Sequence, residues 1–141
     1  MMHITIYHNP RCGTSRNTLA LIRHTGVEPQ VIEYLQRPLT KSELQNLVST
    51  LNVPVREMMR QKEAVYMELQ LDDPKWDDDA LLDHLAVHPI LLNRPIVVTS
   101  MGAKVCRPCE LVLDILPTRQ LTAFQKEDGE IVINEHGERV R

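Results

Sequence analysis

The sequence predicts an α/β fold built on a four-stranded mixed sheet, and three observations predict it. A β-rich run ends in a loop at Cys12 and is followed at once by residues with helical spacing. A second strand-like run follows at 30–35. Far downstream, short β-rich runs at 96–99 and 103–106 flank a turn and precede a helical run. The expected order is therefore strand, helix, strand, then a helical insertion, then strand, strand, helix.

Length and composition set limits on the whole chain. With 141 residues, 43% hydrophobic and 25% charged, we expect one domain with a sizeable core. The net charge of −3 gives no bulk attraction to nucleic acid or to an acidic membrane, so we expect neither as a partner. The N-terminus does not resemble a signal peptide and no apolar run reaches about 20 residues, so a cytoplasmic location is expected. Three cysteines argue against a disulfide framework.

The first half is a predicted βαβ unit. The β-rich run begins at Ile4, helical spacing appears at Leu19 and Ile22, and Gly26 stands just past the expected helix end. A strand at 30–35 then follows. A connection of this kind is right-handed and leaves the two strands parallel.

The middle of the chain, about 40–88, reads as a helical insertion. Residues 40–43 (Thr-Lys-Ser-Glu) form a predicted capping box, short helices are expected at 54–60 and 64–71, and the acidic run 77–79 is expected to cap a helix that stops before Pro89. The apolar residues expected to face inward are Leu44, Leu47, Val48, Leu51, Leu81, Leu82 and Leu85. We interpret the acidic run as capping residues on a solvated face, and we predict no metal site.

The C-terminal part contains a predicted hairpin and a last helix. The runs 96–99 and 103–106 are expected to pair, and 110–116 to continue as a helix. We place the end of the domain at residue 117, so that 1–117 includes the insertion. Residues 118–141 are expected to form an extension, a hairpin or coil that packs loosely on the same domain.

A βαβ unit and a ββα unit in one sheet give a thioredoxin-like fold, whose strand directions bring distant residues together. The end of the first strand, the start of the third and the end of the fourth share one edge of the sheet. Those points hold Cys12, then Arg94 just before Pro95, and Arg107 just after Cys106. Because guanidinium groups bind tetrahedral oxyanions through paired hydrogen bonds, we predict an anion-binding nucleophilic site.

The surroundings of Cys12 predict a reactive thiolate. The start of a helix favours an anion, and nearby cations lower the pKa of a thiol. We expect Arg11, Arg16 and His8 to supply those cations. The turn also resembles a cradle for an oxyanion: Gly13 lets the backbone approach a bound group closely, and the hydroxyl groups of Thr14 and Ser15 are expected to donate hydrogen bonds to it.

Two thiol-based alternatives fit the spacing less well. A dithiol oxidoreductase would have a second cysteine where Ser15 stands, and a cysteine phosphatase would have arginine where Thr18 stands. Cys106 and Cys109 are themselves spaced as C-x-x-C, and one of them could resolve an adduct on Cys12. Two strand spacings would separate them from Cys12 by roughly 10 Å, so we expect two buried thiols instead, although a helix start could lower the pKa of Cys109.

Three stretches resemble the glutaredoxin-coupled arsenate reductases. They are residues 8–19 (His-Asn-Pro-Arg-Cys-Gly-Thr-Ser-Arg-Asn-Thr-Leu), residues 89–98 (Pro-Ile-Leu-Leu-Asn-Arg-Pro-Ile-Val-Val) and residues 106–108 (Cys-Arg-Pro). The tail residues 126–129 (Lys-Glu-Asp-Gly) match as well, so the resemblance covers nearly the whole chain.

The resemblance implies a mechanism. Cys12 would attack arsenate, Arg60, Arg94 and Arg107 match the family's arginines, and His8 matches the histidine that helps to keep the thiol ionised. Glutathione, as co-substrate, would attack the thiol-bound arsenic, and glutaredoxin would remove the glutathione and release arsenite, with no tightly bound cofactor. The fold also implies a cis peptide bond between Arg94 and Pro95. The sequence pattern alone does not place Arg60 relative to Cys12.

One alternative from another class stays open. Redox-sensing transcription regulators of similar fold bind RNA polymerase and turn over no substrate. They usually carry paired N-terminal cysteines, which this chain lacks, and they would leave the three arginines without a role.

Overall fold

The computed structural model describes residues 3–116 and 122–141, and the predicted boundary at 117–118 lies outside them. The chain divides into two compact units. The first unit joins Met1–Glu33 to Arg94–Arg141, and the second is Tyr34–Asn93.

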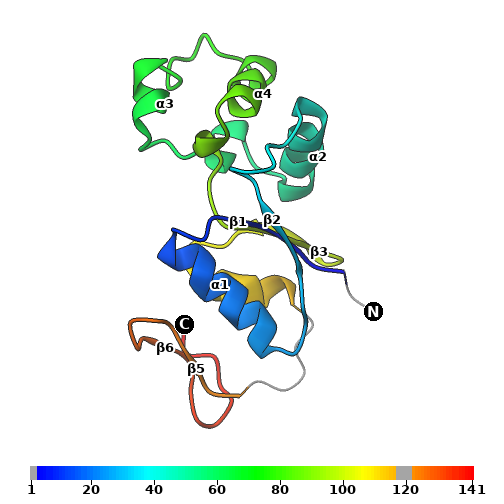
Figure 1. The fold of residues 1–141 in the computed structure, drawn as a ribbon, viewed down its shortest axis with the longest axis vertical. Helices are drawn as coiled ribbons and strands as arrows, with labels where there is room; N and C mark the ends of the chain where they lie inside the picture. The colour runs from blue at the N-terminus through cyan, green and yellow to red at the C-terminus, as the bar shows by residue number, and fades with distance from the viewer. Residues whose placement is uncertain (1–2, 117–121) are drawn as a thin grey trace. The chain divides into compact units, whose positions relative to one another are not determined.

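The first unit is built on the predicted mixed sheet (Figure 1). Its elements are β1 (Thr5–His8), α1 (Gly13–His24), β2 (Gln30–Glu33), β3 (Ile96–Thr99), β4 (Gly102–Val105), the 3-10 helix η3 (Cys109–Ile115), β5 (Phe124–Gln125) and β6 (Ile131–Ile133). The four-stranded sheet has the order β2-β1-β3-β4. β1 and β2 are parallel, whereas β3 is antiparallel to both β1 and β4. This is the thioredoxin-like arrangement, and the expected cis bond between Arg94 and Pro95 is present.

One face of this sheet carries the main hydrophobic core. Ile4 and Ile6 alternate along the first strand and its approach, so both face the same side, where Val97 of β3 joins them. α1 contributes Leu21 and Ile22, both fully buried. Figure 1 shows α1 and η3 on the same side of the sheet. The core thus fixes the start of α1, where Cys12 stands, against the end of β1.

The C-terminal extension is part of this core. We expected it to pack loosely, but Val132 and Ile133 of β6 are 0% and 1% exposed and belong to the core cluster. Ion pairs hold it as well, from Lys126 to Glu110 at 3.0 Å and from Arg139 to Asp114 at 2.6 Å. Two apolar residues inside a charged segment are too short a pattern to predict that the segment is buried. The expected last helix is also different, because it forms as 3-10 helix η3.

The second unit is the helical insertion. Its elements are α2 (Lys41–Leu51), the 3-10 helix η1 (Val55–Met58), α3 (Ala64–Glu68), α4 (Asp78–Val87) and the 3-10 helix η2 (Pro89–Leu91). The capping box is formed, with Glu43 N–H donating to Thr40 Oγ1 at 3.1 Å and Thr40 N–H donating to the Glu43 carboxylate at 3.0 Å. Asp77 caps α4 as expected. The predicted inward leucines of α2 and α4 are buried, while Val48 is half-buried.

The described helices include none that is both long and apolar enough to cross a membrane.

Candidate active site

Cys12 is the N-cap residue of α1. Its backbone is extended, its N–H donates to the Asn9 carbonyl at 3.0 Å, and its own carbonyl accepts the first helical hydrogen bond from Arg16 at 3.0 Å. The first turn of α1 contains no acidic residue. The free N–H groups and the positive end of the helix dipole therefore face the thiol.

Two arginines converge on the Cys12 sulfur, as the strand directions predicted. Arg107 Nη1 lies 3.5 Å from Cys12 Sγ and also donates to the Arg94 carbonyl at 3.0 Å. The Arg94 side chain also lowers the pKa of the thiol, through hydrogen bonding and through its charge. Arg94 precedes β3 and Arg107 follows β4, and the pairing of these strands with each other and with β1 brings both to the end of β1.

These donors set the ionisation of Cys12. Burial raises the pKa of the thiol, but hydrogen bonds from the Ser15 backbone N–H and from Arg94 and Arg107 lower it by more. The net pKa is below the ordinary value of a cysteine. The thiolate, which is the nucleophile, is therefore favoured towards neutral pH.

His8 and Ser15 support Cys12 differently from the expectation. His8 is buried and its Nδ1 lies 2.6 Å from Ser15 Oγ, which also accepts from the Asn9 N–H at 3.1 Å. Burial lowers the pKa of His8, so its ring is mainly neutral and is a weaker source of positive charge than we expected. Ser15 is 0% exposed, so its hydroxyl holds the loop and its backbone N–H, rather than the hydroxyl, serves the thiolate.

The other residues of the predicted cradle lie at the start of the helix. Gly13 and Thr14 are the first two residues of α1 and are half-buried, next to the thiol in the chain. Arg11 is exposed, and its N–H donates to Asn9 Oδ1 at 2.9 Å. The backbone N–H groups of Gly13 and Thr14 fit the predicted anion cradle, whereas that of Arg11 is used by Asn9.

Arg60 belongs to the second unit. It follows η1, its N–H donates to the Leu91 carbonyl at 2.6 Å, and its Nε donates to Glu63 Oε1 at 2.6 Å. Its assignment to the substrate stays a prediction from the resemblance.

Cys106 and Cys109 are buried thiols. They are 0% and 1% exposed, and burial raises their pKa values to about 12 and about 11 respectively. The lowered pKa considered for Cys109 at a helix start is wrong, because burial outweighs the attraction of Lys126.

Sequence reasoning missed Glu127 as a neighbour of the site. Its carboxylate accepts two hydrogen bonds from Arg16, at 2.8 and 3.1 Å, across 111 residues of sequence. Neither residue has a local pattern that predicts this pairing. A surface hollow of about 620 Å³ over β5 and β6 contains none of the candidate residues. The candidate site is therefore identified by its thiol and its arginines and not by a cavity.

Comparison with known proteins identifies the family of this chain. The sequence profile described as the ArsC family matches residues 7–115, which include Cys12, Arg94 and Arg107. This chain belongs to the ArsC family. An Escherichia coli protein named arsenate reductase is 53% identical over 141 residues, covering 100% of both chains. The arsenate reductase ArsI2 of a Synechocystis species is 46% identical over 137 residues, covering 97% of this chain and 98% of that protein.

A solved ArsC-type structure agrees with the fold. The arsenate reductase from Vibrio cholerae has a TM-score of 0.80 and 49% sequence identity, covering 82% of this chain and 98% of that chain. The thioredoxin-like architecture is therefore shared with this ArsC relative.

Proposed function

We propose that this protein reduces arsenate to arsenite, with Cys12 as the nucleophile. The observation that carries the proposal is the Cys12 thiol at the start of α1 with Arg94 and Arg107 as side-chain donors. Relatives of about 50% identity over the full chain bear the name arsenate reductase, which supports the same activity.

The first step uses the charges of the site. The Cys12 thiolate attacks arsenic and forms an S–As bond, and one arsenate hydroxyl group takes up a proton from solvent and leaves as water. Negative charge on the arsenate oxygens increases as the thiolate adds to arsenic. The planar guanidinium forks of Arg94 and Arg107 can bind these oxygens by paired hydrogen bonds. The N–H groups of Gly13 and Thr14 suit the same oxyanion. We assign Arg60 to it as a third cation from the family resemblance.

The electrons come from two external thiols. Glutathione condenses with the Cys12-bound As(V) and releases a second water. A glutaredoxin thiolate then attacks the glutathione sulfur, the bond between that sulfur and arsenic breaks, and its electron pair reduces As(V) to As(III). Glutathione and glutaredoxin leave as a mixed disulfide. Hydrolysis of the remaining S–As(III) bond returns the Cys12 thiol and releases arsenite. Phosphate has the same shape but is not reduced by thiols, so selectivity can arise from redox chemistry.

Arsenite release by the purified protein tests the proposal. With arsenate, glutathione and glutaredoxin, we expect multiple turnovers, and omission of either thiol should stop them. Cys12→Ser should abolish turnover, because the thiolate forms the adduct. Arsenite release by Cys12→Ser would contradict the assignment of Cys12, and no release by the wild-type protein with both thiols present would contradict the function.

A further inference from the structure

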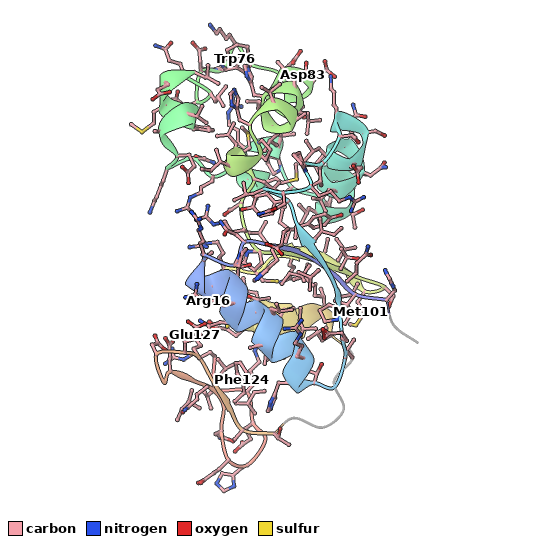
Figure 2. All side chains as sticks on the ribbon, in the orientation of Figure 1. Arg16, Trp76, Asp83, Met101, Phe124 and Glu127 are labelled. Atoms are coloured by element: carbon pink, nitrogen blue, oxygen red, sulfur yellow. The ribbon has the colours of Figure 1, made fainter. Side chains whose placement is uncertain are left out.

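The Arg16 guanidinium lies across the loop that carries Cys12. Its Nε and Nη2 donate to the two Glu127 oxygens at 2.8 and 3.1 Å, and its Nη1 donates to the Pro10 carbonyl at 3.0 Å (Figure 2). A Cβ placed on Gly13 would be 3.6 Å from Arg16 Nη2. Arg16 therefore binds the chain at Pro10, before Cys12, and its Nη2 lies over the space next to Gly13, after Cys12.

Glu127 is held in place by the hairpin that carries it. Its backbone N–H donates to Asn17 Oδ1 at 3.0 Å, on α1 next to Arg16. The preceding Lys126 forms an ion pair with Glu110 at 3.0 Å, and the two side chains are 12% and 7% exposed. The carboxylate is thus presented to Arg16 from an anchored turn.

Arg16 has little of its hydrogen-bonding capacity left for a substrate. Three of its N–H groups, one on each nitrogen, are occupied by Glu127 and Pro10. A guanidinium bound by both oxygens of a carboxylate has spent the fork that would bind an oxyanion. Its place in the site is structural, whereas Arg94 and Arg107 contact the thiol.

We infer that Glu127 is a positioning residue: it holds Arg16 against the Pro10 carbonyl, and so keeps the Cys12 loop where Arg94 and Arg107 can bind the thiolate. The inference rests on the proposed function for its effect on turnover. Its effect on the thiol itself is independent of any substrate.

Positioning and simple charge effects have opposite signs. The charged groups that face Cys12 are Arg16 from α1, Arg94 before β3 and Arg107 after β4. Removing the negative charge of Glu127 leaves more net positive charge near the thiolate and would lower the pKa of Cys12. Losing the loop position weakens the hydrogen bonds from Arg94 and Arg107 and raises that pKa. The direction of the shift therefore separates the two effects.

Alkylation of Cys12 by iodoacetamide, followed against pH, is the first test. Glu127→Gln should raise the midpoint by about half a pH unit. Glu127→Asp keeps the charge but shortens the reach, so it should raise the midpoint too. With arsenate, glutathione and glutaredoxin, Glu127→Gln should lower kcat/KM about tenfold, mainly through kcat, because a misplaced nucleophile reacts slowly. A lowered or unchanged midpoint in Glu127→Gln would overturn the inference.

Glu28→Gln is the matched control. Arg23 Nε donates to the Glu28 carboxylate at 2.9 and 3.0 Å, also from α1, but at the other end of that helix. Glu28→Gln removes the same charge from the same kind of exposed ion pair. The midpoint of Cys12 alkylation and the turnover should therefore stay at wild-type values. An equal rise in Glu28→Gln would show that the shift does not depend on the contact between Glu127 and Arg16, and would overturn the inference.

A double-variant comparison tests whether Glu127 acts through Arg16. Arg16→Ala should raise the alkylation midpoint as Glu127→Gln does, and adding Glu127→Gln to it should cause no further shift. A full additional shift would show that Glu127 acts by another route and overturn the inference. If the wild-type protein releases no arsenite yet Glu127→Gln still raises the midpoint, the proposed function fails and the positioning role stands. If arsenite is released and the midpoint is unmoved, only the positioning role fails.

Discussion

Cys12 and Cys109 are both cysteines at the start of a helix, yet their pKa values are shifted in opposite directions. Cys12 caps α1 and its pKa is lowered, whereas Cys109 begins η3 and its pKa is raised to about 11. Both have cations nearby: Arg94 and Arg107 lie beside Cys12, and Lys126 lies beside Cys109. The difference lies in hydrogen bonding and burial: Cys12 is half-buried and receives bonds from Ser15, Arg94 and Arg107, while Cys109 is 1% exposed.

The comparison shows that a helix start does not by itself make a thiol reactive. η3 is a 3-10 helix of seven residues, whose hydrogen bonds are less well aligned than those of α1. Burial then penalises the thiolate without enough donors to offset it. Donors aimed at the sulfur, together with access to solvent, decide which cysteine is the nucleophile.

Thiol reactivity should give the largest contrast. At pH 7 a pKa of about 11 leaves only about one thiol in 10⁴ ionised, and Cys106, at about 12, still fewer. We expect iodoacetamide to modify Cys12 alone in the folded protein, at a rate that rises with pH through a midpoint below the ordinary cysteine value. All three thiols should react after unfolding in urea. Peptide mass spectrometry measures this, and rapid labelling of Cys109 in the folded protein would break the comparison.

Replacing the donors to Cys12 should have the next largest effect. Lysine keeps the charge but lacks the planar fork, so Arg94→Lys and Arg107→Lys should each lower kcat/KM for arsenate by about a hundredfold. Each should also raise the alkylation midpoint of Cys12, because a donor to the thiolate is weakened. Wild-type turnover in both variants, with unchanged circular dichroism, would show that neither guanidinium fork acts on the oxyanion.

Replacing the buried thiols should have the smallest effect on turnover. Cys106→Ser and Cys109→Ser, singly and together, should change glutathione- and glutaredoxin-dependent arsenite release by less than about twofold, since neither thiolate forms readily. Each buried hydroxyl should lower the free energy of unfolding in urea by about 1–3 kcal/mol. Cys106→Ala with Cys109→Ala provides a second pair without the buried hydroxyls. A folded variant that stalls after one turnover would mean that this pair resolves the Cys12 adduct.

Much of this structure could be predicted because its signals are local. Periodicity, the capping box at 40–43 and the acidic run before α4 each predict an element from neighbouring residues, and strand directions then bring Cys12, Arg94 and Arg107 together. The outcomes that differed depend on burial or on distant partners. The Ser15 hydroxyl turns inward to His8, and Glu127 meets Arg16 only through the folded hairpin. No pattern of adjacent residues encodes either contact.

The place where the helical insertion joins the sheet has a consequence for how the chain can vary. β2 ends at Glu33 opposite His8, and β3 begins at Ile96 opposite Tyr7, so the segment between them leaves and re-enters at one edge of the sheet. Two strand spacings, about 10 Å, separate these points. Doubling the length of a flexible segment with fixed ends costs only about 0.6 kcal/mol in closure entropy. The loops between the helices of this insertion can therefore change in length at little entropic cost to the pairing of β1 with β3, so new surface can be added there while the sheet keeps Cys12, Arg94 and Arg107 together.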